Sequence, residues 1–458
     1  MPALLATLID EIDAVRDCRL YGRVTAVLGI LVEIGGIERR LSSGDRCTLL
    51  ARGGRRVPCE VIGFRGGRAL SMPFGSLAGI GIGCVAEIAE AQPVIHPSAA
   101  WLGRVINALG EPIDGKGPLP LGDHAVPLLN QPPPAHRRAR VGPKVDLGVR
   151  ALNGFVSCCR GQRMGIFSGS GVGKSVLMSM LARYTEADVN VIGLVGERGR
   201  EVQEFIADDL GPEGMARSVV VVATSDESPL MRRQAAYTMM AVAEAFRDDG
   251  QHVFCLMDSV TRFAMAQREI GLSAGEPPTS KGYPPTAFSE LPKLLERAGP
   301  GVDAGAITAM FTVLVEGDDH NEPIADAVRG ILDGHIVLDR QIAERGRFPA
   351  IDVLRSVSRL MPDCNTAEQN EVVLAARRQI ATYENMAEMI RLGAYRKGSS
   401  PEVDEAIRLY PALEAFLAQD KEERTDLAEG YARIAEIIGK AAPRSADAEQ
   451  TPQEGAAA

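Results

Sequence analysis

A short glycine-rich segment, placed between an apolar run and a helix-forming run, constrains this chain more than any other feature. Residues 163–167 are typical of a strand, and Ser168-Gly169-Ser170-Gly171-Val172-Gly173-Lys174-Ser175 follow. Small residues let the backbone wrap a phosphate, whose charge the N–H groups at a helix N-terminus then stabilise. The pattern is that of a phosphate-binding loop, with Ser168 where the strict motif begins with glycine. We expect Ser168 through Val176 to bind a nucleotide, with Lys174 at the β- and γ-phosphates and Ser175 on Mg²⁺.

Two carboxylates stand where neighbouring strands of an α/β sheet are expected to end. The apolar run 252–257 leads into Asp258, and the run 189–195 leads into Gly196-Glu197-Arg198. Ligands of parallel sheets bind at the carboxyl ends of the strands. We therefore expect Asp258 to hold the water shell of the magnesium ion and Glu197 to orient and polarise an attacking water.

The pattern of apolar residues divides the chain into five parts. Apolar runs alternate with helical stretches between about residues 150 and 350, which predicts a mostly parallel sheet covered on both faces. Short β-prone runs separated by glycine turns precede it and predict a small barrel or sandwich. The expected parts are an N-terminal helix (1–20), a β-barrel domain (21–92), an α/β domain (93–360), a helical C-terminal domain (361–440) and a disordered tail (441–458).

Two stretches allow more than one interpretation. The first twenty residues carry an apolar stripe that suits either packing against the chain's own body or docking of a partner. Residues 93 to 145 are rich in proline and glycine and predict a winding linker. The barrel region holds few aromatic residues, namely Tyr21, Phe64 and Phe74, which favours a structural barrel over one that stacks the bases of a single strand.

Composition excludes several classes of protein. Apolar residues make up 45% and charged residues 24% of the 458 residues, which is ordinary for a globular protein. No run approaches the ~18 apolar residues of a membrane-spanning helix, and the N-terminus lacks the features of a signal peptide. The net charge of −10 argues against a protein that coats nucleic acid. The eight cysteines show no zinc-ligand spacing, and we expect reduced, mostly buried thiols in a cytoplasmic protein.

Further segments extend the phosphate loop and Gly196-Glu197-Arg198 into one consistent set. They include Leu102-Gly103-Arg104-Val105, Asp258-Ser259-Val260-Thr261-Arg262-Phe263, Gly282-Tyr283-Pro284-Pro285-Thr286, Phe348-Pro349-Ala350-Ile351-Asp352-Val353-Leu354 and Ser356-Val357-Ser358-Arg359. With this set the chain resembles the catalytic subunits of rotary ATPases over roughly residues 20 to 435. It is more similar to the type III secretion ATPases, and most similar to the flagellar export ATPases.

The resemblance implies a fold and a set of roles. The fold is an N-terminal β-barrel, a RecA-like P-loop ATPase core and a helical C-terminal domain, assembled as a homohexamer that uses ATP and Mg²⁺. Glu197 matches the catalytic carboxylate, Arg198 its neighbour and Arg262 a further arginine on the phosphate side. Phe348 matches the aromatic residue that packs on adenine, which is tyrosine in F-type catalytic subunits. Arg359 matches the arginine finger that reaches the next subunit's site.

Two departures from the F-type pattern bear on function. The acidic lever motif of those subunits is missing, and only Asp420-Lys421-Glu422-Glu423 stands in the C-terminal region. This weighs against a synthase subunit that drives a central stalk in the usual way. The presence of Glu197 weighs against a non-catalytic subunit.

The resulting hypothesis is an ATPase that energises protein export during flagellum assembly. The resemblance implies regulatory stator-like and stalk-like export subunits, the export gate, and export chaperones with their cargo as partners. It places the protein in the cytoplasm, peripheral to the inner face of the cytoplasmic membrane through those partners. An ATPase of a virulence injectisome shares every motif and is the alternative. A hexameric nucleic-acid translocase is a remote one, because the acidic charge balance argues against binding nucleic acid.

Overall fold

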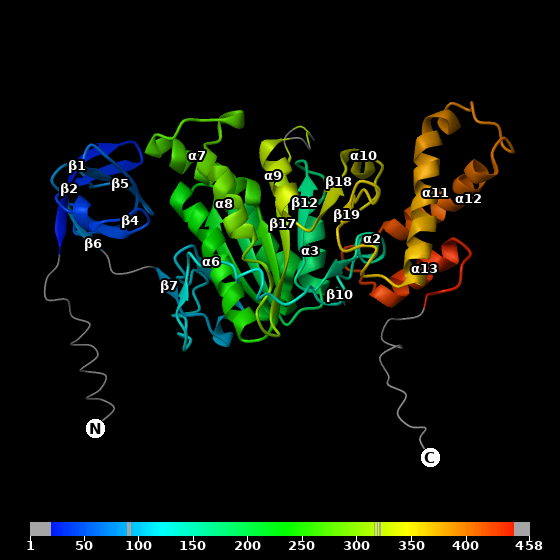
Figure 1. The fold of residues 1–458 in the computed structure, drawn as a ribbon, viewed down its shortest axis with the longest axis horizontal. Helices are drawn as coiled ribbons and strands as arrows, with labels where there is room; N and C mark the ends of the chain where they lie inside the picture. The colour runs from blue at the N-terminus through cyan, green and yellow to red at the C-terminus, as the bar shows by residue number, and fades with distance from the viewer. Residues whose placement is uncertain (1–19, 89–92, 316, 318, 320–321, 444–458) are drawn as a thin grey trace, which may run out of the picture.

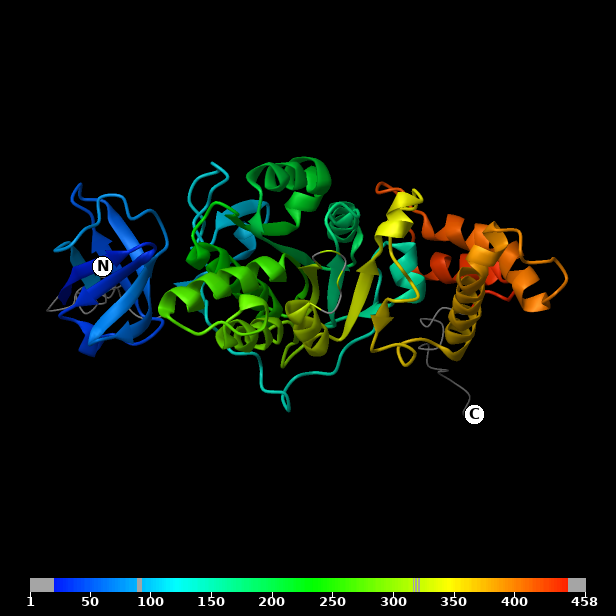
Figure 2. The same cartoon turned by 90° about the horizontal axis from the view of Figure 1, so that it is seen from above.

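The computed structural model describes residues 20–88, 93–315, 317, 319 and 322–443. Within these residues a barrel, an α/β core and a helical domain lie in a row along the longest axis (Figure 1). Figure 2 shows the same order from above, with the core between the other two parts. The expected N-terminal helix lies, except for its last residue, outside the described part of the chain, as does most of the expected tail.

The N-terminal part is a closed barrel with strand order β1-β2-β5-β4-β3-β6. Buried and half-buried residues alternate along β3, where Cys47 and Leu49 are the buried ones. Closure leaves no free sheet edge. The strands are β1 (Tyr21–Leu28), β2 (Leu31–Gly35), β3 (Arg46–Leu50), β4 (Arg56–Arg65), β5 (Arg68–Pro73) and β6 (Val85–Ile88).

A buried ion pair fastens the barrel to the core. Arg233 of α6 (Pro229–Asp248) donates to both carboxylate oxygens of Glu60 in β4, each at 2.6 Å. Apolar residues of both parts, including Phe74 of the barrel and Leu230 of the core, also pack together in one buried cluster. Charge and apolar contact together fix the barrel on the helix that carries Arg233.

The core is built on a nine-stranded sheet within the described residues, with strand order β19-β18-β12-β17-β15-β13-β14-β8 and β16 beside β17. All neighbours from β18 to β8 run parallel. The strands are β8 (Arg104–Asn107), β12 (Arg163–Ser168), β13 (Val189–Glu197), β14 (Ser218–Thr224), β15 (His252–Asp258), β16 (Gly299–Pro300), β17 (Ala306–Leu314), β18 (Gly334–Leu338) and β19 (Val357–Ser358).

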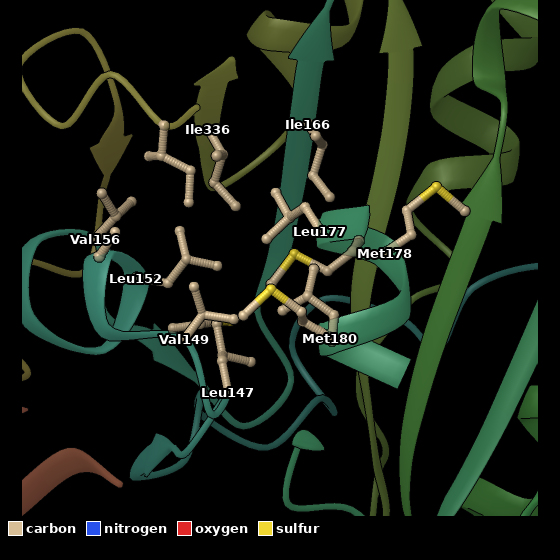
Figure 3. Close-up of a cluster of buried hydrophobic side chains, with 14 of the residues drawn as sticks. Leu147, Val149, Leu152, Val156, Ile166, Leu177, Met178, Met180 and Ile336 are labelled. Atoms are coloured by element: carbon tan, nitrogen blue, oxygen red, sulfur yellow. The ribbon is translucent and has the colours of Figure 1, made fainter. Parts of the chain in front are cut away.

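Both faces of the sheet are covered. On one face, residues of β12 and of α3 (Lys174–Tyr184) form a cluster with the 147–156 segment, and Figure 3 shows Ile166, Leu177 and Met180 in it. On the other face a second cluster gathers residues of α6 and three further helices. These are α7 (Val260–Ala274), α8 (Pro285–Leu295) and α9 (Pro323–Ile331).

The proline-rich stretch from 93 to 145 contains strands as well as loops, contrary to its interpretation as a linker alone. β8 is an edge strand of the main sheet and pairs with β14. The short elements of the core are β7 (Val94–Ile95), β9 (Val126–Pro127), β10 (Lys144–Val145), α2 (Arg150–Phe155), β11 (Cys158–Cys159), α4 (Gly199–Glu204), a π-helix (Phe205–Leu210), α5 (Gly211–Ala216) and α10 (Arg340–Glu344).

The C-terminal part is helical, as expected, and consists of α11 (Ala367–Arg391), α12 (Pro401–Leu417) and α13 (Leu427–Ile437). A capping box formed by Thr366 and Gln369 starts α11. The ring of Phe416 in α12 meets Phe155 of α2 edge-on, with 6.4 Å between the centroids. In the described part of the chain, no helix is both long and apolar enough to cross a membrane.

Candidate functional site

The phosphate loop occupies the sequence-predicted context. β12 ends at Ser168, α3 begins at Lys174, and β12 lies between β17 and β18 inside the sheet. Gly171 and Gly173 have φ angles of 76° and 92°, in the left-handed region that glycine adopts without strain. The loop therefore delivers the N-terminus of an eleven-residue helix to the carboxyl edge of the sheet.

A cleft of about 720 Å³ opens at this edge. The side chains of Ser168 and Val172 are buried in the core and do not line it. Its lining comes from the loop, from the ends of β13 and β17, and from α4, α7 and α10. The residues are Gly169, Ser170, Gly171, Gly173, Lys174, Ser175, Val176, Glu197, Arg198, Glu201, Thr261, Arg262, Met265, Leu314, Val315, Gly317 and Arg340.

Lys174 binds the two carboxylates that the sequence placed at the strand ends. Its Nζ lies 2.5 Å from Oδ1 of Asp258 and 3.7 Å from Oε1 of Glu197. The two acids meet because β13 and β15 are neighbours in the sheet. Thr312 of the adjacent β17 donates a hydrogen bond to the same Asp258 oxygen at 2.6 Å, which fixes that carboxylate.

The pKa of Glu197 is raised from its ordinary value of 4.5 to about 7. Burial is the largest cause and the nearby Asp258 charge acts in the same direction, whereas Lys174 and Arg262 lower the pKa in part. Within the described residues, its buried Oε1 has no hydrogen-bond partner. A carboxylate with a pKa near neutrality and an oxygen that accepts no hydrogen bond is suited to hold a water and accept its proton.

The two arginines near Glu197 are placed differently. Arg262 comes from the first turn of α7, which lies close to the end of β13. Glycine at position 196 permits this approach, since a Cβ atom there would lie only 2.9 Å from Cβ of Arg262. Arg198 also lines the cleft, but its side chain is 79% exposed and it pairs with Glu201 at 3.5 Å.

Two oxygen donors suited to Mg²⁺ lie together beside the cleft. Ser175 and the carboxylate of Asp258 both line a small adjoining cavity of about 80 Å³. Oxygen donors from a hydroxyl and a carboxylate are the kind that this hard cation prefers. Asp258 is 5% exposed, so a cation there would be largely shielded from solvent.

Phe348 lies against the phosphate loop. A Cβ atom at Gly173 would lie 3.1 Å from Cδ1 of the Phe348 ring, so glycine permits the close approach. The ring is 41% exposed, and the Phe348 carbonyl accepts a hydrogen bond from the Gln419 N–H at 2.8 Å. An aromatic face is thus available beside the loop and near the C-terminal domain.

Arg359 is not brought to the cleft of its own chain. Ser358 pairs with Gly334, the first residue of β18, whereas the phosphate loop follows Ser168, which pairs with Leu338, the last residue of β18. The strand between these points spans roughly 13 Å. Arg359 therefore stands at the opposite edge of the sheet, where its Nη2 donates to the Arg329 carbonyl at 3.1 Å.

Several residues of the site were missed in the sequence. Thr312 supports Asp258, Glu201 lines the cleft from α4, four residues after Glu197, and Nη2 of Arg340 donates to the Ser170 carbonyl at 3.2 Å. The closeness of Glu201 to Glu197 in the sequence was a usable signal. Thr312 and Arg340 reach the site only through the order of the strands, which no local pattern encodes.

Comparisons with known proteins identify similarities over nearly the whole chain. Residues 148–358 match the model of the ATP synthase alpha/beta family, nucleotide-binding domain, and residues 365–436 match the T3SS EscN ATPase C-terminal domain. A flagellum-specific ATP synthase of Caulobacter vibrioides is 59% identical over 440 residues, covering 95% of this chain and 99% of that protein.

Other similar proteins serve type III secretion. A type 3 secretion system ATPase of Xanthomonas euvesicatoria is 46% identical, covering 95% of this chain and 97% of that protein. Among solved structures, the assembled ATPase EscN from the enteropathogenic E. coli type III secretion system superposes with a TM-score of 0.85. It is 39% identical and covers 91% of this chain and 100% of that one.

Proposed function

This chain belongs to the flagellum-specific ATP synthase family and is an ATPase, and we propose that it hydrolyses ATP to energise the export of flagellar proteins. The observation that carries the proposal is the 59% identity to a flagellum-specific ATP synthase over nearly the full length of both chains. A cleft holding a phosphate loop, a lysine and two carboxylates supports the same reading.

The proposed reaction is an in-line attack of water on the γ-phosphate. The loop and Lys174 would bind the phosphates, so Lys174 would exchange part of its contact with Asp258 for phosphate oxygens. Glu197 would orient the water and accept its proton, consistent with a pKa raised to about 7. Ser175 and Asp258 are the residues that would hold Mg²⁺, which when bound would neutralise charge on the phosphates. Phe348 would pack on the adenine ring.

We propose further that the working form is a homohexamer in which Arg359 acts in a neighbouring subunit. Its position at the edge of the sheet opposite the phosphate loop supports action on another chain's site. One solved relative is an assembled EscN ATPase, and another is EscN in complex with its central stalk EscO. By analogy, a stalk-like partner is proposed here. Stator-like subunits, the export gate and export chaperones with cargo are also proposed, with peripheral membrane association through them.

The decisive experiment pairs enzymology with genetics. The purified chain should hydrolyse ATP, and deletion of its gene in the native bacterium should abolish external flagellar filaments. Complementation with the intact gene should restore filaments, whereas complementation with Glu197→Gln should not. Normal filaments in the deletion strain would contradict the flagellar assignment.

A type III secretion ATPase of an injectisome is the second candidate. The 46% identical relative from Xanthomonas euvesicatoria and the match of residues 365–436 to the EscN C-terminal domain favour it. It predicts that the deletion strain keeps its filaments and loses secretion of virulence proteins. A nucleic-acid translocase would instead show strong stimulation of the ATPase by RNA, which we do not expect from a chain of net charge −10.

A further inference from the structure

Two cysteines and a lysine meet where the core joins the helical C-terminal domain. β10 and β11 form a small ribbon beside α2, on the side of the core that faces these helices (Figure 1). Lys144 of β10 lies directly across from Cys159 of β11. Its ammonium donates to Gln369 at 2.5 Å and to Asn365 at 3.2 Å, and both residues belong to the start of the C-terminal domain.

The second cysteine comes from the other side of the joint. Cys364 precedes Asn365, and its Sγ lies 3.8 Å from the Asn365 side-chain oxygen. Lys144, which lies across from Cys159, contacts the same Asn365 oxygen at 3.2 Å, so Cys159 and Cys364 are gathered around one polar group, and both thiols are free. Cys159 is 1% exposed, whereas Cys364 is only partly buried, so a small molecule in solution reaches Cys364 first.

The surroundings favour the thiolate of Cys364. The hydrogen bond from Cys159 and the Lys144 ammonium both lower the pKa of Cys364, although burial opposes them. The same hydrogen bond and burial raise the pKa of Cys159, which keeps its proton. Because the thiolate is the nucleophilic form, Cys364 is the sulfur that reacts first, and Cys159 is the sulfur that reacts with the oxidised Cys364 in the second step.

We propose that Cys364 and Cys159 are a modification site, at which hydrogen peroxide forms a disulfide between the core and the C-terminal domain. In the first step the Cys364 sulfur attacks the peroxide, an S–O bond forms, and the O–O bond breaks. The departing hydroxide takes up the proton that Cys364 lost and leaves as water. In the second step the Cys159 sulfur attacks the sulfenic acid, an S–S bond forms, and the second oxygen leaves as water with the Cys159 proton. The peroxide is reduced to two waters, and the two thiols are oxidised.

The other described cysteines lack this combination. Cys47 and Cys59 face each other across β3 and β4, but both are fully buried inside the barrel. Cys84, Cys158 and Cys255 are also buried, and burial raises the pKa of Cys158 and of Cys255. Partial exposure, a partner thiol and an adjacent ammonium coincide at Cys364, so oxidation is expected to select this pair.

A disulfide between Cys159 and Cys364 would link the core covalently to the C-terminal domain at their contact. Cys364 lies two residues before Thr366, the N-cap of α11, and Cys159 lies in β11 of the core. Polar contacts already hold these parts together: the Lys144 ammonium donates to Gln369, and the Tyr431 hydroxyl shares a hydrogen bond with Oγ of Ser157 in the core at 3.0 Å. A disulfide would turn this contact into a covalent tether that a reductant removes.

The test uses the full-length protein and hydrogen peroxide. Samples treated with graded peroxide are alkylated, digested with trypsin and analysed by mass spectrometry under non-reducing conditions. We expect peptide 151–160 linked to peptide 360–377, with the link lost after dithiothreitol. Fragment masses that place the link on Cys159 distinguish it from its neighbour Cys158.

Matched variants define the pair. Cys158→Ser should form the link at a rate within about twofold of the unmodified chain, whereas Cys159→Ser and Cys364→Ser should not form it. Lys144→Met should slow the link several-fold at neutral pH, because the thiolate fraction of Cys364 falls. Linkage through Cys158, or equal oxidation of Cys255 and Cys364, would overturn the proposal. Conversion of Cys364 to sulfinic acid without a link would also overturn it. Should a serine variant fail to fold, the linked peptide of the unmodified chain still decides the question.

Discussion

The Lys174 ammonium forms an ion pair with Asp258 at the candidate nucleotide cleft, with 2.5 Å between Nζ and Oδ1. The same Nζ lies 3.7 Å from Oε1 of Glu197. One cation thus stabilises two buried carboxylates that would otherwise repel each other. The same three groups are those proposed to meet the phosphates and the metal. The residues proposed to bind the nucleotide and the metal therefore also hold one another in place.

Lys174→Ala should weaken nucleotide binding and hydrolysis together. The ammonium is expected to contact ground-state phosphates as well as the transition state, so its loss raises Kd and lowers turnover. Fluorescent-nucleotide titration and steady-state kinetics measure the two effects. Lys293→Ala, at a 67% exposed position of α8, is the matched control and should change neither. Unchanged nucleotide affinity in Lys174→Ala would argue against the placement of the phosphate loop.

Glu197→Gln should keep nucleotide binding and lose at least ~10²-fold in turnover, as expected for removal of a general base. Glutamine has nearly the same shape but does not accept the proton of the attacking water. Binding is measured by titration and turnover by phosphate release, with Glu371→Gln on the exposed surface of α11 as the control. Hydrolysis at the unmodified rate with normal binding would remove Glu197 from the catalytic role.

The pKa of Glu197 predicts a pH-dependent stability of the nucleotide-free protein. Burial and Asp258 raise this pKa from 4.5 to about 7, so between these values the folded state binds more protons than the unfolded state. The contribution of Glu197 to the free energy of unfolding therefore falls as pH rises through this window. The Tm of Glu197→Gln minus that of the unmodified chain should increase between pH 5 and pH 8. A constant difference would show that the carboxyl titrates near its ordinary value.

The buried pair of Glu60 and Arg233 predicts a large loss of stability when one partner is removed. The two side chains are 7% and 10% exposed, and breaking a buried pair costs about 3–5 kcal/mol because a charge remains without its partner. Glu60→Gln should lower the free energy of unfolding by an amount in this range in urea titrations. Glu87→Gln, whose partner Arg56 is 59% exposed, should cost less than ~1 kcal/mol. An equal loss in the free energy of unfolding for the two variants would show that burial does not determine the stability contributed by the pair.

Patterns of neighbouring residues predicted most of the strands and helices. They failed where an element is defined by its pairing with a strand far away in the sequence. The strand before the phosphate loop was expected over 163–167 and observed as β12 (Arg163–Ser168), because an apolar run bounded by glycines is a local signal. β8 (Arg104–Asn107) was read as linker, since a four-residue strand in a proline-rich stretch is defined only by its partner β14. Thr312 was missed for the same reason, because its bond to Asp258 depends on β17 lying beside β15.

The sharpest prediction concerns Arg359, which stands at the opposite edge of the sheet from its own phosphate loop. An arginine finger supplied by a neighbour typically contributes ~10³–10⁵ in rate, and lysine does not reproduce its planar, always-charged fork. Arg359→Lys should therefore hydrolyse ATP poorly while binding it nearly normally. Arg355→Lys, at a half-exposed position nearby, is the control and should retain activity.

Mixing two inactive variants tests whether Arg359 acts on the neighbouring subunit. In rings that combine Arg359→Ala with Glu197→Gln, some interfaces join an intact Glu197 to an intact Arg359 of the next subunit. Those interfaces should be active, so the mixture should recover a measurable fraction of the unmodified rate once subunit exchange is demonstrated. A mixture that stays inactive leaves two explanations, action within one chain or a ring that requires every site. A tandem fusion with a single intact interface separates them, and an inactive fusion would remove the support for action between subunits.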